Sequence, residues 1–344
     1  MTGKHIPRPV RLGRRQFFAA FMGVLAAWSA RAQVGERRFR IAFANVNEDP
    51  NVHLEGLGFT GLEVRRSFEL ASRTLPVEMI FYDNGGDAQK ALVNATDAIE
   101  RKVDLFIAYN ADIETNAEIG RRMRVAGIPV LAVNTPVSDA PLYAADNVAA
   151  GHIAGKALAE FARENWSDQV VVAAILGDLG DTGPYLTDRV RGISEALRQD
   201  LPEITLTQLD TSGNPPRVDG LLSKFLSSQT RRRVLIAALD DQTALAAKAA
   251  VERASRINDC VIVGQGLDRS IHGGAAEKKE IDPSNRGSII LGSVAYYLDR
   301  YGYEVLPIAL RMLHGEGVPS RTTTKHILVS AKNVFKEYPP TDMN

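Results

Sequence analysis

Residues 146–161 read DNVAAGHIAGKALAEF and carry the clearest amphipathic stripe in the chain. The apolar side chains recur at spacings of three and four, the period of one helix face, and they are Ala150, Ile153, Ala154, Ala157, Leu158 and Phe161. This predicts a helix that buries one side. The pattern of strands and helices restarts here, so we place a first crossing between two lobes near residue 145.

Short apolar runs alternate with helical stretches on both sides of this helix. Four predicted strands precede it, at 40–44, 77–82, 105–109 and 130–133, and four follow it, at 170–176, 204–209, 234–238 and 261–263. The chain then predicts a strand at 287–291, a helix at about 295–314 and a last strand at 323–329. Repeated strand–helix units form parallel sheets covered by helices. The sequence predicts an α/β fold with two doubly wound parallel-sheet lobes packed side by side.

The N-terminus has the features of an export signal. Residues 1–32 hold six basic residues and no acidic one, followed by a twelve-residue apolar run at 17–28 and an Ala-Arg-Ala site at 30–32. The run is too short to span a bilayer, which takes about 20 residues. Gly13-Arg14-Arg15-Gln16-Phe17-Phe18 resembles a twin-arginine signal, and ordinary secretion is the alternative. We expect cleavage near Gln33 and a soluble periplasmic protein without a lipid anchor.

Charge and cysteine content exclude several classes of protein. Six of the 41 basic residues lie in the predicted signal, which leaves 35 against 41 acidic residues in a mildly acidic mature chain. A nucleic acid partner requires clustered basic residues, so we expect none. The single cysteine, Cys260, excludes a disulfide within one chain and adjoins an apolar run that favours burial. We expect a monomer.

Motifs for common chemistries are absent from the sequence. The six histidines show no metal-binding spacing, and we predict neither a metal site nor a cofactor. No nucleophile elbow or phosphate loop occurs, and Gly264-Gln265-Gly266 lacks the third glycine of a dinucleotide fingerprint. These absences weaken hydrolase, NTPase and dehydrogenase interpretations.

Polar residues follow the predicted strands at the edge where open parallel sheets bind ligands. Planar amide, carboxylate and guanidinium groups can meet two adjacent hydroxyls of a sugar or polyol. Each such residue, taken alone, is also typical of a helix cap or a turn. The candidate ligand-binding residues are Asn47, Asn110, Asn134, Asp181, Arg189, Asp240, Gln265 and Ser293.

Four motifs in this order resemble the periplasmic sugar-binding proteins of ABC transporters, in the ribose-binding and LacI-like group. They are Asp146-Asn147 with Gly151-His152-Ile153-Ala154-Gly155, Arg189-x-x-Gly192-Ile193-x-x-Ala196-Leu197, Asp240-Asp241-Gln242-Thr243-Ala244, and Ile262-Val263-Gly264. The resemblance covers about residues 38–335. It implies a type I periplasmic binding protein with a three-segment hinge, crossing near 145, 292 and 319.

The resemblance also implies roles for three residues. Arg189 and Asp240 stand where the family grips ligand hydroxyls, and Asn134 stands where the fourth strand presents an acid or amide. The family's paired aromatics after the first strand have no counterpart in residues 47–53, and its later aspartate is displaced to Asp268. We consider three tyrosines as replacement stacking faces, or as packing residues: Tyr109, Tyr185 and Tyr296.

The predicted domains are 1–32 as signal, 38–145 with 293–318 as lobe 1, 146–292 with 319–335 as lobe 2, and 336–344 as a tail. The resemblance implies that the lobes close on a small sugar or polyol, and we expect an ABC transporter permease in the inner membrane to recognise the closed form. Two alternatives stay open. One is a sensory role with a chemoreceptor or sensor kinase, and the other is an exported carbohydrate-active enzyme that uses Asp178, Asp181 or Asp240.

Export gives the first prediction. The N-terminus of the protein recovered from periplasm should lie near Gln33 when sequenced, and replacing Arg14 and Arg15 with Lys should leave precursor in the cytoplasm. A periplasmic chain that still begins at Met1 would contradict the cleavage. Unchanged export of the double-lysine variant would contradict the twin-arginine route alone.

Overall fold

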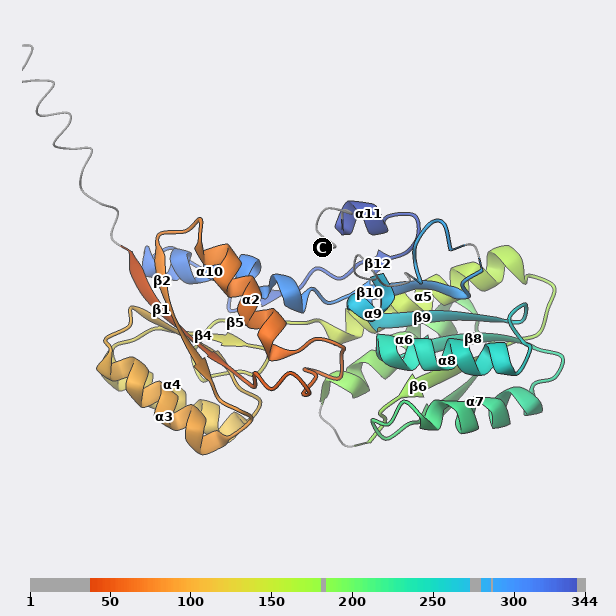
Figure 1. Ribbon diagram of the computed structural model, residues 1–344, viewed down its shortest axis with the longest axis horizontal. Helices are drawn as coiled ribbons and strands as arrows, with labels where there is room; N and C mark the ends of the chain where they lie inside the picture. Colours follow the sequence, from red (N-terminus) through yellow and green to blue (C-terminus); the bar gives the residue numbers. More distant parts are fainter. Residues whose placement is uncertain (1–37, 181–183, 273–279, 286, 339–344) are drawn as a thin grey trace, which may run out of the picture.

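Two parallel sheets, one in each lobe, organise the chain (Figure 1). The computed structural model describes residues 38–180, 184–272, 280–285 and 287–338, so the predicted signal peptide and most of the tail lie outside it. Lobe 1 has the strand order β11-β5-β4-β3-β1-β2, with every neighbouring pair parallel. These strands are β1 (Phe39–Asn45), β2 (Val77–Asp83), β3 (Leu105–Tyr109), β4 (Val130–Val133), β5 (Leu142–Ala144) and β11 (Arg321–Thr323).

Helices cover both faces of the lobe 1 sheet. Residues alternate along β1, so Ile41 and Phe43 join one buried cluster with Phe68, whereas Ala42 and Ala44 join another. The first face carries α2 (Gly61–Ser72), the short helix η1 (Leu298–Arg300) and α10 (Tyr301–Leu313), and the second carries α3 (Ala88–Glu100) and α4 (Ile113–Ala126).

Lobe 2 repeats this architecture with the order β12-β10-β9-β8-β6-β7, in which only the β10–β12 pair is antiparallel. Its strands are β6 (Val171–Gly177), β7 (Thr205–Asp210), β8 (Arg233–Ala238), β9 (Cys260–Gly266), β10 (Ile290–Ala295) and β12 (Leu328–Val329). Its helices are α5 (Asn147–Asn165), α6 (Pro184–Asp200), α7 (Arg217–Ser228), α8 (Asp241–Arg253), α9 (Arg269–His272) and α11 (Val334–Glu337).

Three crossings connect the lobes, and two lie later than the sequence predicts. The β10 strand runs to Ala295 in lobe 2, and β11 pairs with β5 in lobe 1. The predicted boundaries at 292 and 319 are therefore wrong by a few residues. The strand predicted at 323–329 is two short strands on different sheets, and such short pieces leave no periodicity to read.

His326 joins all three crossings at one point. Its Nδ1 lies 2.9 Å from the carbonyl oxygen of Ala295, and its Nε2 accepts a hydrogen bond of 3.0 Å from the backbone N–H of Asp146. These contacts require a neutral ring with the proton on Nδ1. Burial lowers the pKa of His326, which favours this neutral form.

This hinge contact gives the second prediction. Because the native pKa of His326 lies below that of the unfolded chain, unfolded protein binds the proton more readily, and stability is lost as pH falls through about 6.5. His326→Gln should retain an acceptor and remove that contribution, which is at most about 1.4 kcal/mol per pH unit. Urea unfolding at pH 7.5 and 5.0 measures it. The exposed His314→Gln is the control, and an unaltered slope in His326→Gln would contradict the assignment.

Candidate ligand-binding cleft

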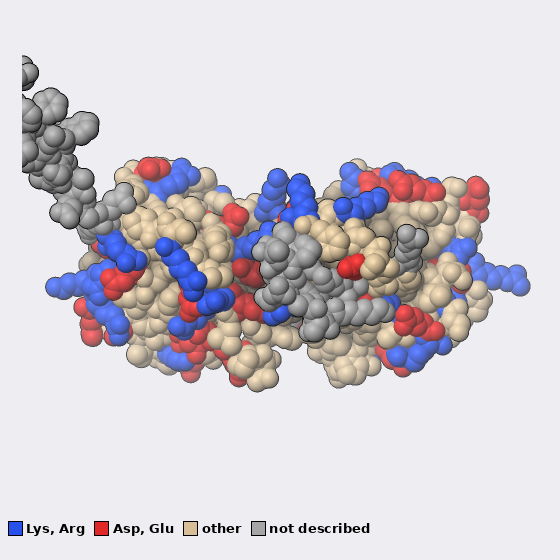
Figure 2. Space-filling model, turned by 45° about the horizontal axis from the view of Figure 1, so that its top comes forward, with Lys and Arg blue, Asp and Glu red and all other residues tan. Residues whose placement is uncertain are grey.

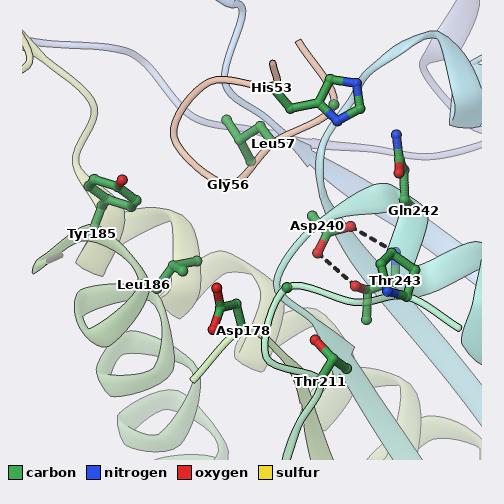
Figure 3. Close-up of a pocket in the computed structure, with 13 residues that line it drawn as sticks. His53, Gly56, Leu57, Asp178, Tyr185, Leu186, Thr211, Asp240, Gln242 and Thr243 are labelled. Atoms are coloured by element: carbon green, nitrogen blue, oxygen red, sulfur yellow. Dashed lines mark hydrogen bonds between the residues drawn. The ribbon is translucent and has the colours of Figure 1, made fainter. Parts of the chain in front are cut away.

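A cavity of about 280 Å³ lies at the carboxyl ends of the lobe 2 strands. We name it the cleft cavity, and we name residues 46–60, between β1 and α2, the cleft loop. Lobe 1 supplies this loop, which lies over the cavity (Figure 3). Lobe 2 supplies the other walls. The lining residues are His53, Gly56, Leu57 and Gly58 of the loop, and Asp178, Tyr185, Leu186, Thr211, Gly213, Pro215, Asp240, Gln242 and Thr243 of lobe 2.

Arg189 lies on α6 beside this cavity and is fully buried. Its Nε donates to Asn147 Oδ1 at 2.9 Å, and its Nη1 donates to the carbonyl of Leu239 at 3.2 Å. Two further acceptors come from the cleft loop: Nη2 donates to the carbonyl of Glu55 at 2.8 Å, and Nη1 to that of Gly56 at 3.3 Å. The guanidinium therefore binds both lobes.

An aromatic ring supports the same guanidinium. The Tyr296 ring centroid lies 4.6 Å from the Arg189 guanidinium carbon, within cation–π range. The Tyr296 hydroxyl donates to Gln265 Oε1 at 2.8 Å. Burial raises the pKa of this phenol to about 12, so it is a neutral donor at physiological pH. The ring packs against the arginine instead of lining the cavity.

Close packing of α5 against α6 holds Arg189 in this position. A Cβ on Gly192 would overlap the carbonyl of Val148, and a Cβ on Gly151 would overlap the carbonyl of Arg189. A Cβ on Gly155 would lie 2.6 Å from the carbonyl of Ile193. Only glycine allows the two backbones to approach this closely.

Asp240 lies at one wall of the cavity and also caps α8. Its Oδ1 accepts from the backbone N–H of Thr243 at 2.7 Å, and its Oδ2 accepts from the Thr243 hydroxyl at 2.7 Å. Burial raises the pKa of Asp240, and hydrogen bonding to Thr243 and the charge of Arg189 oppose that rise. Both the cap and the cleft interpretations of this residue fit its position.

Asn134 and Glu55 meet on the lobe 1 side. Asn134 Nδ2 and the Tyr109 hydroxyl both donate to Glu55 Oε1, and Asn134 Nδ2 lies 3.4 Å from the Tyr301 hydroxyl. Asn134 adopts a left-handed φ of 59°, which asparagine tolerates better than most residues. Burial raises the pKa of Glu55, an effect that the Tyr109 hydrogen bond opposes. No motif or strand-end position in the sequence marks Glu55 as a site residue.

A layer of buried polar side chains lies behind the cavity. Ser293 Oγ donates to Asp241 Oδ1 at 2.6 Å and accepts from the backbone N–H of Leu267 at 3.0 Å. Burial and the charge of Asp268 raise the pKa of Asp241 well above its ordinary value. Among the described residues, Gln265 Nε2 has no hydrogen-bond partner. Ser293 and Gln265, like Arg189 and Asn134, are not among the residues that line the cavity.

A family model described as "Periplasmic binding protein domain" matches residues 59–316, well over half of the chain. The chain belongs to this family. The predicted membership of the periplasmic binding proteins is confirmed, and so is the type I fold. No curated protein matches the sequence.

Solved structures of periplasmic binding proteins share this fold. A solute-binding protein from Mycobacterium smegmatis with bound glycerol is 20% identical, with a TM-score of 0.64 over 87% of this chain and 96% of that one. One from Actinobacillus succinogenes with bound D-allose is 17% identical, with a TM-score of 0.67 over 88% and 100%. One from Agrobacterium vitis with bound α-D-tagatopyranose is 18% identical, with a TM-score of 0.61 over 86% and 96%.

The remaining predicted site residues of this periplasmic binding protein lie outside the cleft cavity or outside the described residues. Asn47 Oδ1 accepts from the backbone N–H of Asp49 at 2.8 Å, and Asn110 Nδ2 lies 3.3 Å from Asn116 Oδ1. Neither residue is among those that line the cleft cavity, and each forms hydrogen bonds with residues close to it in the sequence. Asp181 lies outside the described residues.

Several residues that line the cavity were indicated only weakly by the sequence, or not at all. Asp178 follows a predicted strand and was also considered as a catalytic residue, Tyr185 was considered as a stacking face, and both line the cavity. Thr211 had no signal in the sequence beyond following a strand, and Gln242 stood in the Asp240–Ala244 motif without an assigned role. In the part of the chain that the structure describes, no group of three potential ligands could hold a metal ion. No helix there is long and apolar enough to cross a membrane.

The glycine contact between α5 and α6 gives the third prediction. Gly192→Ala should destabilise the protein by about 1–3 kcal/mol, the usual cost of overpacking, because the added methyl group overlaps the carbonyl of Val148. The control is Gly220→Ala on the exposed side of α7, where a Cβ meets nothing within 4 Å. It should gain up to about 1 kcal/mol from helix propensity. Equal urea-unfolding free energies for the two variants would contradict the packing argument.

Proposed function

We propose that this protein is a solute receptor that closes on a small sugar or polyol and delivers it to an ABC transporter permease. The observation that carries the proposal is the cleft cavity, which lies between the lobes at the carboxyl ends of parallel strands. The protein would act in the periplasm as a soluble monomer, after export through the signal described above.

The lining of the cavity suits hydroxyl groups. Asp178 and Asp240 offer carboxylate acceptors, Thr211 offers a hydroxyl, and Gln242 offers an amide that both donates and accepts. Tyr185 and Leu186 add apolar surface against which the C–H groups of a sugar can pack. This mixture of a few fixed polar groups with apolar walls is typical of small-molecule sites.

Arg189, Asp240 and Asn134 are the contacts that we assign first to the ligand. The solved relatives with bound glycerol, D-allose and α-D-tagatopyranose support a polyhydroxylated ligand, because the same fold holds such molecules in them. Function would follow from closure about the three-segment hinge. The ligand stabilises the closed form in proportion to its extra contacts there, and no bond is made or broken.

Two other functions use the same cleft. A sensory protein would bind the same solute and present the closed form to a chemoreceptor or sensor kinase. An exported enzyme would use Asp178 or Asp240 as an acid or base, and the raised pKa of Asp240 is the feature that it would exploit. Recovery of the bound sugar unaltered after long incubation, by mass spectrometry, separates binding from catalysis.

Ligand binding gives the fourth prediction. D-Allose, D-tagatose, allitol, D-glucose and glycerol form the first panel, and we expect a Kd of roughly micromolar for the best member, about −8 kcal/mol. At a thousandfold excess over Kd it should add about 4 kcal/mol to the unfolding free energy, read as a rise in Tm.

Substitutions at two aspartates that each cap a helix test the site. Asp240→Asn should weaken binding at least tenfold, since a charged hydrogen bond contributes about 1.5–3 kcal/mol. Asp87→Asn is the control, because Asp87 also caps a helix, accepts from Lys90 N–H and lies away from the cavity. If no sugar or polyol in a broad panel raises Tm, the sugar assignment fails.

A further inference from the structure

The cleft loop already supplies what a ligand would supply to Arg189. The carbonyl oxygens of Glu55 and Gly56 are consecutive along the chain and accept from Nη2 and Nη1 of one guanidinium. Adjacent hydroxyls of a sugar would meet the same two nitrogens in the same forked manner. The other two acceptors, Asn147 and Leu239, belong to lobe 2 itself.

The tip of the loop has a backbone that needs support. Glu55 and Gly56 both adopt left-handed conformations, with φ of 58° and 63°. Glycine adopts this region freely, but a glutamate there is strained and persists only where surrounding contacts hold it. The contacts that hold Glu55 are its carbonyl on Arg189 and its carboxylate on Tyr109 and Asn134.

The loop touches lobe 2 at further points. Leu57 is 2% exposed, and a Cβ on Gly266 would lie 3.6 Å from its Cδ2. Gly58 faces Asp268, where a Cβ would overlap the Oδ2 atom. Leu186 of α6 lies against Gly56: a Cβ added to Gly56 would be 3.3 Å from Leu186 Cδ2. A segment that begins and ends in lobe 1 is thus seated in lobe 2, as Figure 3 shows for Gly56 and Leu57.

We propose that residues 55–58 act as an internal ligand that holds the lobes closed when no solute is present. The loop tip competes with the solute for Arg189, and the solute must offer two neighbouring oxygen acceptors to replace the two carbonyls. A vicinal diol meets this requirement. The statement about the solute rests on the proposed function, whereas closure by the loop does not depend on it.

Glu55 is the positioning residue of this device. Its carboxylate fixes the tip from the lobe 1 side through two donors that both reach Oε1, while its carbonyl reaches across to lobe 2. Removing the carboxylate should free the tip and let the lobes separate. A glutamine can keep one oxygen in the Oε1 position, so it should retain the closed form.

The test measures the distance between the lobes without any ligand. Nitroxide labels at Val93→Cys on α3 and Lys224→Cys on α7 report closure, because both helices lie on the same side of the molecule (Figure 1). The native Cys260 is buried, and its pKa is raised to about 12, so it does not compete for the label. Pulsed electron resonance of the mature protein should give one short distance.

Glu55→Ala should lower the ratio of closed to open molecules at least tenfold. The open molecules should appear as a second, longer distance between the two labels. Glu55→Gln should stay closed, and so should Val52→Ala, an exposed position in the same loop. Tyr109→Phe removes one donor to Glu55 and should shift the ratio in the same direction, which keeps the test valid if Glu55→Ala folds poorly. Parent-like distances in both Glu55→Ala and Tyr109→Phe, or an open parent, would overturn the proposal.

Competition is tested separately with D-allose as the probe. Release of the loop should lower the apparent Kd of Glu55→Ala by the factor lost from the closed-to-open ratio, since the parent must first displace its own loop. Weaker D-allose binding in a variant that opens would overturn the competition. If D-allose binds neither protein, the proposed function fails for this sugar, and the distance measurement still decides whether the loop closes the lobes.

Discussion

The structure of the cleft depends on one constraint, which is that the buried guanidinium of Arg189 must find acceptors. In the part of the chain that the structure describes, it forms no salt bridge, and its bonds go to one amide oxygen and three carbonyls. The α5–α6 glycine contact fixes where the charge lies, and the cleft loop then completes its shell. The aromatic ring of Tyr296 also stabilises this charge, through a cation–π contact.

Much of this arrangement could be predicted from the sequence because it is local. The alternation of apolar runs with helical stretches gave both sheets, and the apolar face of α6 placed Arg189 toward the sheet and not toward solvent. Asp240 follows a strand and begins a helix, a position that serves both as a cap and as a cleft wall. Figure 2 shows basic and acidic side chains interspersed over the visible face, as the near-balanced charge suggests.

The remaining features depend on contacts between distant parts of the chain. Glu55 reaches Asn134 across 79 residues, and its carbonyl reaches Arg189 across 134, so no local pattern marks it. Ser293 was expected after a strand and lies within β10, one layer behind the cavity, because the strand extends farther than its apolar run suggested. Asn47 and Asn110 also lie outside the cavity lining, since a polar residue after a strand can equally form hydrogen bonds with nearby parts of the chain.

A cleft that satisfies itself changes what ligand affinity measures. Closing on a solute exchanges oxygen acceptors of the loop for oxygen acceptors of the solute, so the binding free energy is the difference between two similar sets of bonds. Only contacts that the loop cannot make, such as those to Asp178 and Gln242 on the cavity wall, add to that difference. The backbone strain at Glu55 also favours solute binding, because displacing the loop releases that strain. The loop therefore lowers the affinity for every solute that must replace its two carbonyls, while contacts to the cavity wall add affinity and select among such solutes.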